Sequence, residues 1–199
     1  FGPGKQFANF GAIGAGWIFS EEVFFQKKFP FLSFGKIRGS YGITGNDQLT
    51  DYQYLDTYSP TAYPYMGAGG LFPTRLFNPD FAWEVNKKIE SAMELGFLRD
   101  RIFFTTSYYH NRSSNQLVGY SLPLITGGES IQFNLPATIQ NSGWEFELSS
   151  VIIKTGAFVW NSAFNLSIPK NKLVAYPNFS ASTYTNSYII GRSLFTRKK

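Results

Sequence analysis

Acidic side chains are the residues of this sequence best suited to chemistry. Glu145 and Glu147 stand two positions apart, so on a β-strand their carboxylates would share one face. Glycoside hydrolases use paired carboxylates, which makes hydrolysis by Glu145 or Glu147 one hypothesis. His110 is the only histidine and the chain has no cysteine, so a metal site or a histidine-based triad lacks partners within this chain. We therefore expect no metal and no cofactor.

The carboxylate pair belongs to a segment, residues 141–166, in which polar and apolar residues alternate. The apolar set consists of Trp144, Phe146, Leu148, Ser150 and Ile152, then Phe158, Trp160, Ser162, Phe164 and Leu166. The polar set consists of Glu145, Glu147 and Ser149, then Asn161, Ala163, Asn165 and Ser167. Successive strand side chains point to opposite faces, so the pattern predicts two amphipathic strands. Between them Lys154-Thr155-Gly156 predicts a tight turn, with Gly156 at positive φ.

Such a hairpin fits two environments. In a soluble β-sandwich the aromatic face packs into a core and the polar face meets water. In a transmembrane barrel the aromatic face meets lipid and the polar face meets a watery lumen. Soluble strands average about 5–6 residues, whereas membrane strands need roughly 9–11. The alternation from residue 144 to 152 already meets the longer requirement, which favours the barrel.

Composition supports a β-rich chain and argues against several other classes. Aromatic residues make up 19% of the 199 residues, while 19 glycines and 10 prolines favour many turns. No window approaches the roughly 18 apolar residues of a membrane helix. The net charge is +5, but the only basic run, residues 197–199, predicts a solvated tail rather than a nucleic-acid site. The opening FGPGKQF lacks a starting methionine and a signal-peptide core, so we expect a piece of a longer protein.

The same alternation predicts four further strands. Three cover residues 7–20, 32–44 and 81–97, and another begins at residue 102. Ser20 is predicted to cap a short helical turn over residues 20–28. The apolar faces of these strands contain Ile13, Ala15, Trp17 and Phe19, then Ile37, Tyr41 and Ile43, then Trp83, Val85, Ile89, Met93, Leu95 and Phe97, then Ile102, Phe104, Thr106 and Tyr108.

The connections between these strands differ in length. Turns near residues 99–101 and 154–156 are tight, the one at 20–31 is modest, and those at 45–80 and 111–140 are long. From residue 167 the sequence predicts irregular structure. Short turns at one end and long loops at the other are typical of an outer-membrane barrel, with periplasmic turns and extracellular loops.

Aromatic residues sort by height when the strands are placed this way. The predicted outer girdle contains Tyr41, Trp83, Tyr108 and Trp144, and the inner girdle contains Phe97, Phe158 and Trp160. Six strands do not close a membrane barrel, and open edges in lipid are not viable. The sequence therefore predicts an all-β, antiparallel transmembrane β-barrel segment, about six strands of a larger barrel.

The long connection over residues 46–80 holds the candidate binding residues. Ordered loops of this length are usually functional, and exposed tyrosines can stack on sugar rings or grip peptides. We take Tyr54, Tyr58 and Tyr63 as candidate substrate-binding residues. The open alternative is that these rings pack the loop against itself.

Four motifs occur along the chain in an order that a known family shares. Residues 36–46 read KIRGSYGITGN, and residues 78–84 read NPDFAWE. Leu122-Pro123 with Thr126-Gly127 and the stretch NSGWE at residues 141–145 follow. Together they resemble the KxRxSYGxTGN, NPxLxWE, LPxxTG and NxGxE motifs of SusC/RagA-like TonB-linked outer-membrane transporters. Phe81 and Trp144 stand where other apolar residues are usual.

This resemblance implies a 22-stranded barrel with an N-terminal plug, energised through the TonB complex in the outer membrane of a Gram-negative, Bacteroidetes-like bacterium. It implies import of oligosaccharide or peptide fragments with a SusD-like lipoprotein as lid. Residues 1–199 would then be a partial TonB-dependent receptor β-barrel domain, with no plug, signal peptide or final strand. Lumen-facing carboxylates are ordinary in such barrels, so we expect a transporter rather than an enzyme. The alternative is a secreted all-β glycan-binding domain that uses the loop tyrosines.

Overall fold

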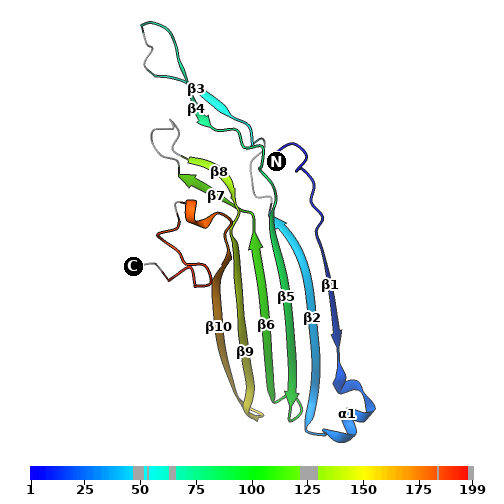
Figure 1. Ribbon diagram of the computed structural model, residues 1–199. Coiled ribbons are helices and arrows are strands. Elements are labelled where there is room, and N and C mark those ends of the chain that lie inside the picture. Colours follow the sequence, from blue (N-terminus) through cyan, green and yellow to red (C-terminus); the bar gives the residue numbers. More distant parts are fainter. Residues whose placement is uncertain (47–51, 53, 63–65, 122–129, 183, 197–199) are drawn as a thin grey trace.

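One antiparallel sheet dominates the computed structural model, which describes residues 1–199 except 47–51, 53, 63–65, 122–129, 183 and 197–199. Its six strands follow chain order, β1-β2-β5-β6-β9-β10 (Figure 1). They are β1 (Gly11–Trp17), β2 (Leu32–Asn46), β5 (Glu84–Phe97), β6 (Ile102–Ser114), β9 (Thr138–Thr155) and β10 (Phe158–Ala175). The predicted six-stranded antiparallel segment is confirmed.

Two short hairpins stand at one end of the sheet, which we call the long-loop end (Figure 1). They are β3 (Thr57–Pro60) with β4 (Leu71–Arg75), and β7 (Gln116–Ser121) with β8 (Ser130–Leu135). The opposite, short-turn end carries the 3₁₀ turn η1 (Phe19–Glu21), the helix α1 (Val23–Lys28) and the two tight turns. The predicted separation of short and long connections is confirmed. Each long connection contains a hairpin that the sequence did not reveal, because strands this short show too little alternation to be recognised.

No helix in the described part of the chain is both long and apolar enough to cross a bilayer. A second 3₁₀ turn, η3 (Phe179–Ala181), lies in the segment that follows β10. This segment folds back beside the upper part of β10 (Figure 1), where the Gly191 amide donates to the Leu173 carbonyl at 2.7 Å.

The last two strands extend beyond the predicted hairpin. β9 begins at Thr138 and β10 ends at Ala175, so the expectation of irregular structure from residue 167 is wrong. The consecutive pairs made by Lys170, Asn171 and Lys172 are polar on both strands, as with Asn171 opposite Asn141. The Asn171 Nδ2 donates to Asn141 Oδ1 at 2.6 Å. Such pairs lack the apolar alternation that reveals a strand in the sequence.

The first strand is shorter than the predicted one at residues 7–20. Phe19 leaves the strand and is buried in η1. The N-cap of α1 is Glu22, which makes no capping side-chain hydrogen bond, so the predicted cap at Ser20 is wrong. The Glu22 carboxylate instead accepts a hydrogen bond from the Trp17 indole Nε1 at 3.2 Å. The residue at the start of α1 is thus in contact with the end of β1.

One of the two tight turns differs from expectation in its backbone conformation. Gly156 lies in the turn between β9 and β10, but its φ is not positive. Positive φ occurs instead in the turn between β5 and β6, at Leu98, Arg99 and Asp100. Ser33 holds this turn, because its Oγ donates to Asp100 Oδ1 at 2.7 Å and accepts from the Asp100 amide at 2.9 Å.

Candidate functional site: the polar face of the sheet

Strand pairing determines which side chains share a face. Directly paired residues lie on the same side of an antiparallel sheet. One row of pairs runs through Arg38, Ala92, Ser107, Glu145 and Ser167. The adjacent row runs through Trp17, Ile37, Met93, Thr106, Phe146 and Leu166. We call the two sides the polar face and the apolar face, and both agree with the predicted alternation.

The alternation is interrupted near the turn between β9 and β10. The register shifts between Trp160 and Asn161. Trp160 pairs with Ile153 and Asn161 pairs with Val151, so Ile152 is the extra residue of a β-bulge. Ile153 therefore occupies the position opposite Trp160, and Ile152 has no partner on β10.

An ion-pair network lies on the polar face between β2 and β5. The Arg38 Nη1 is 2.7 Å from Glu90 Oε1, and its Nε is 3.1 Å from Glu94 Oε1. The three side chains are 41%, 44% and 21% exposed, respectively. Water therefore screens the network in part. A single guanidinium therefore bridges two carboxylates that share one side of β5.

The carboxylate pair suggested by the sequence is on this same face. Glu145 and Glu147 pair with Ser107 and Thr105 of β6. The Ser107 Oγ donates to Glu145 Oε2 at 3.3 Å. Within the described residues, no three potential metal-binding side chains gather into a site.

The polar face is hollowed. A cavity of about 530 Å³ lies over β2, β5, β6 and β9, and one of about 400 Å³ lies over β6, β9 and β10. Both are lined by Ser107 and Glu145, and the second also by Arg38 and Glu147. Hollows on this side indicate that the sheet curves toward its polar face. The arrangement can hold water and hydrogen-bond a polar solute.

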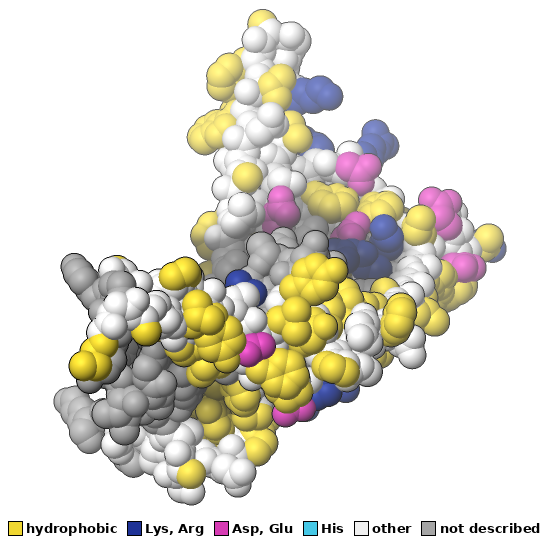
Figure 2. Space-filling view, turned by 90° about the horizontal axis from the view of Figure 1, so that it is seen from above, with side chains coloured by type: hydrophobic (Ala, Val, Ile, Leu, Met, Phe, Trp, Pro, Cys, Tyr) yellow, Lys and Arg dark blue, Asp and Glu magenta, His cyan; other side chains and the backbone are white. Residues whose placement is uncertain are grey.

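The apolar face exposes large side chains. Phe164 is 60% exposed, and Trp160 and Trp144 are about half exposed. Trp144 packs beside Tyr108, with ring centroids 5.0 Å apart. From the long-loop end, hydrophobic side chains are seen gathered in patches beside charged ones (Figure 2). Continuous apolar surface of this kind marks contact with lipid or protein.

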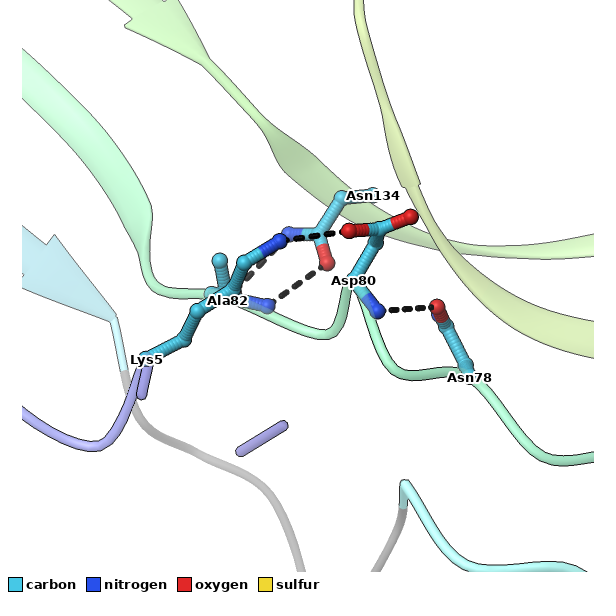
Figure 3. Close-up of polar contacts among 5 residues, drawn as sticks. All are labelled: Lys5, Asn78, Asp80, Ala82 and Asn134. Carbon is cyan, nitrogen blue, oxygen red and sulfur yellow. Dashed lines mark hydrogen bonds and ion pairs between the residues drawn. The ribbon is translucent and has the colours of Figure 1, made fainter. Parts of the chain in front are cut away.

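Polar contacts at the long-loop end fasten the segment that precedes β5 (Figure 3). The Nδ2 of Asn134, on β8, donates to the Ala82 carbonyl at 2.8 Å and to the Asn115 carbonyl at 3.0 Å. Its Oδ1 accepts from the Ala82 amide at 2.9 Å, and the residue is 9% exposed. The Lys5 Nζ lies 2.6 Å from Asp80 Oδ1. Hairpin β7–β8 and the N-terminal segment are thus tied to the same stretch of chain.

This region also corrects the predicted start of the third strand. β5 begins at Glu84, so Phe81 and Trp83 precede it. Phe81 is only 1% exposed, and Trp83 stacks on Phe1 with ring centroids 4.5 Å apart. Trp83 therefore lies at the long-loop end as predicted but packs within the protein. Sequence reasoning missed Asn134, because a lone asparagine gives no sign of its partners.

The two described candidate tyrosines, Tyr54 and Tyr58, do not line the polar hollow. Tyr58 lies on β3 and is 56% exposed. A hydrogen bond to the Asp56 carboxylate, together with its negative charge, raises the pKa of the Tyr58 hydroxyl. Tyr54 is half-buried and its ring centroid is 6.4 Å from that of Phe77, as the packing alternative expects. Tyr63 lies outside the described residues.

Three of the four sequence motifs occupy structural positions that can be described. KIRGSYGITGN lies on β2, NPDFAWE leads into β5, and NSGWE lies on β9. The motif formed by Leu122-Pro123 and Thr126-Gly127 lies outside the described residues. The described motifs therefore lie on strands of the main sheet and at its long-loop end.

Comparison with known proteins gives consistent matches. The family described as "TonB dependent receptor-like, beta-barrel" matches residues 4–195. TonB-dependent receptor P39 of Formosa agariphila is 30% identical over 174 residues, 87% of this chain and 16% of that protein. TonB-dependent receptor SusC of Bacteroides thetaiotaomicron is 24% identical over 200 residues, 92% of this chain and 19% of that protein.

The fold has a counterpart among solved structures. The RagAB peptide importer in its closed-closed state contains a chain that matches 96% of this one with a TM-score of 0.80 and 20% identity. The match covers 21% of that chain. This chain likewise spans less than a fifth of the curated relatives described above. It belongs to the TonB-dependent receptor β-barrel family, is SusC/RagA-like, and forms a segment of an antiparallel transmembrane barrel.

Proposed function

We propose that this chain forms part of the barrel wall of a TonB-dependent importer in the outer membrane, which takes up oligosaccharide or peptide nutrients. The observation that carries the proposal is that one sheet has a hollow polar face and an exposed apolar face. A membrane barrel needs both, since its outside meets lipid and its inside meets water. The likeness to SusC and to the RagAB peptide importer supports the transport role.

In this role the chain performs no covalent chemistry. The apolar side chains hold the wall in lipid, while the polar ones keep the lumen wet. Arg38, Glu145 and Glu147 then serve as lumen charges rather than as catalytic groups. The hairpins at the long-loop end would shape the substrate entrance, with Tyr54, Tyr58 and Tyr63 as candidate contacts. A plug coupled to the TonB complex would supply the energy, and a SusD-like lipoprotein would cover the entrance.

The test is to measure the depth of two adjacent positions in the full-length protein within a bilayer. Phe146 is on the apolar face and Glu147 is on the polar face. A fluorophore or spin label at position 146 is expected to contact lipid, and one at position 147 is expected to contact water. If both positions report water or protein, the wall assignment is wrong and a soluble binding domain becomes the better explanation.

A further inference from the structure

The connection between β1 and β2 folds over the apolar side of the sheet. Trp17 ends β1 on the apolar face, opposite Ile37. Gly35 is on the same face of β2, where it pairs with Leu95. A Cβ atom at Gly35 would occupy the space of the Phe19 ring. Glycine therefore lets η1 lie directly against the side of the sheet that faces lipid.

Aromatic rings continue the apolar face around the short-turn end. Consecutive contacts join Trp17 to Phe19 (6.0 Å), Phe19 to Phe25 (4.9 Å), Phe25 to Phe29 (5.6 Å), Phe29 to Phe31 (6.0 Å) and Phe31 to Phe97 (6.4 Å). The rings at both ends of this series, Trp17 and Phe97, are on the apolar face of the sheet. The connection is thus continuous with the lipid-contacting surface.

The outer side of α1 combines exposed apolar and basic residues. Val23 is 66% exposed and Phe24 is 60% exposed. Lys27 and Lys28 follow at helical spacings of three to five residues and are also exposed, so the four side chains share about half of the helix circumference. Phe25 points to the protein side, where it contacts Phe19. Both acidic residues of the connection precede α1.

We propose that this outer side of α1 docks onto the phospholipid headgroup layer at the short-turn end of the barrel. Val23 and Phe24 enter the boundary between headgroups and acyl chains, and Lys27 and Lys28 reach outward to the phosphates of anionic lipids. The apolar pair is in the first turn of α1 and the basic pair is in the last, and long lysine side chains can reach from an apolar surface to charged groups outside it. The charge complementarity and the continuity with the apolar face favour lipid over a protein partner. The proposal rests on the membrane placement of the sheet.

The position of α1 is tested with single cysteines in the full-length protein in nanodiscs, after any native cysteines are replaced. Phe24→Cys and Gln26→Cys carry an environment-sensitive fluorophore, and the two positions are about 160° apart around the helix. Quenching by nitroxide lipids is expected at position 24, and quenching by aqueous iodide at position 26. If iodide reaches position 24, or neither quencher does, the docking site is wrong. A probe at Phe146→Cys tests the barrel placement separately.

The role of the lysines is tested by lipid composition. Nanodiscs with and without phosphatidylglycerol are compared for the position-24 signal and for the lipids retained by the purified protein. The wild type is expected to enrich the anionic lipid, by roughly fivefold per lysine near the surface. The double variant Lys27→Gln/Lys28→Gln is expected to lose the enrichment, and Lys27→Arg/Lys28→Arg to keep it. Equal enrichment in the wild type and the glutamine variant would overturn the assignment.

Discussion

Arg38 is the residue that links two strands electrostatically on the polar face. It bridges Glu90 and Glu94 across the β2–β5 pair. We expect Arg38→Gln to lower the free energy of unfolding of the full-length protein by about 0.5–1 kcal/mol at low salt, because partly exposed ion pairs are screened by water. Denaturant titration in lipid measures this. Arg38→Lys keeps the charge without the forked geometry. Its free energy of unfolding should therefore lie between those of the wild type and Arg38→Gln.

Salt provides the control for this prediction. Added salt should reduce the difference in the free energy of unfolding between the wild type and Arg38→Gln, since exposed ion pairs weaken as the screening length falls. A difference that is unchanged by salt would assign the effect to packing of the arginine stem.

Asn134 joins hairpin β7–β8 to the segment that precedes β5. Its amide makes three hydrogen bonds, two of them to Ala82. Asn134→Ala leaves these part-buried backbone groups without that partner, and the loss of three hydrogen bonds costs about 1–3 kcal/mol. Hydrogen exchange at the Ala82 amide should accelerate by about tenfold or more. Asn171→Ala removes an exposed pair on β10 and should leave the Ala82 amide unchanged.

Tyr58 is the described candidate tyrosine with the most exposed ring. Its hydroxyl is hydrogen-bonded to the Asp56 carboxylate, and this bond together with the carboxylate charge raises the pKa of the hydroxyl. The ring is then the part available to a substrate. Tyr58→Ala should weaken binding by about 0.5–1.5 kcal/mol, roughly two- to tenfold in Kd, whereas Tyr58→Phe should not. Calorimetry of the full-length protein with candidate oligosaccharides and peptides checks this. Equal affinity for the alanine variant would favour a ring that only packs the loop.

At the scale of elements, Gly143 controls how closely β6, β9 and β10 approach one another. A Cβ atom there would lie 2.8 Å from the Tyr109 hydroxyl oxygen and 2.9 Å from the Ile168 carbonyl oxygen. We expect Gly143→Ala to destabilise the full-length protein by about 1–3 kcal/mol, as overpacking does. The matched control is Gly39→Ala, whose nearest contact would be the Glu90 carbonyl at 3.7 Å. Comparable unfolding midpoints for the two variants would contradict the argument.

The strands that the sequence predicts best are those with lipid on one side and water on the other. This contrast places a large apolar residue at every second position of β9, from Trp144 to Leu148. The upper part of β10 lacks the contrast, and so the strand beyond residue 167 was invisible in the sequence. Alternation also cannot reveal a register shift such as the bulge at Ile152, because both strands remain apolar there.

Residue types along the chain did not predict the start of α1 or the ion pairs on the polar face. Ser20 is a good cap by type, yet the N-cap of α1 is Glu22, whose carboxylate accepts a hydrogen bond from the Trp17 indole. The polar face of the candidate site was predictable from alternation. Its ion pairs were not, since Arg38 reaches its partners diagonally across a register that only the paired strands define.

At the scale of the whole molecule, the sheet of the described residues is open on both sides, apart from the pairing of Leu173 with Gly191 and Arg192. β1 and β10 are its edge strands, and their outward backbone groups cannot remain unpaired in lipid. Neighbouring strands of a larger barrel would satisfy them. The orientation of the two faces in such a barrel is then fixed: the apolar face is outside and the hollow polar face is inside. Any substitution can be judged by the face on which it falls.

Arginine substitutions at Phe164 and Asn165 test this orientation of the two faces. Phe164 pairs with Leu148 on the apolar face, and Asn165 pairs with Glu147 on the polar face. Phe164→Arg places a charge against lipid, at a cost of about 2–4 kcal/mol near the membrane midplane. Asn165→Arg places the same charge in the watery lumen beside a carboxylate. We expect the first variant to reduce the folded fraction of the full-length protein in membranes and the second to leave it unchanged. The reverse result would mean that the wall is inside out, and equal losses would mean that neither face meets lipid.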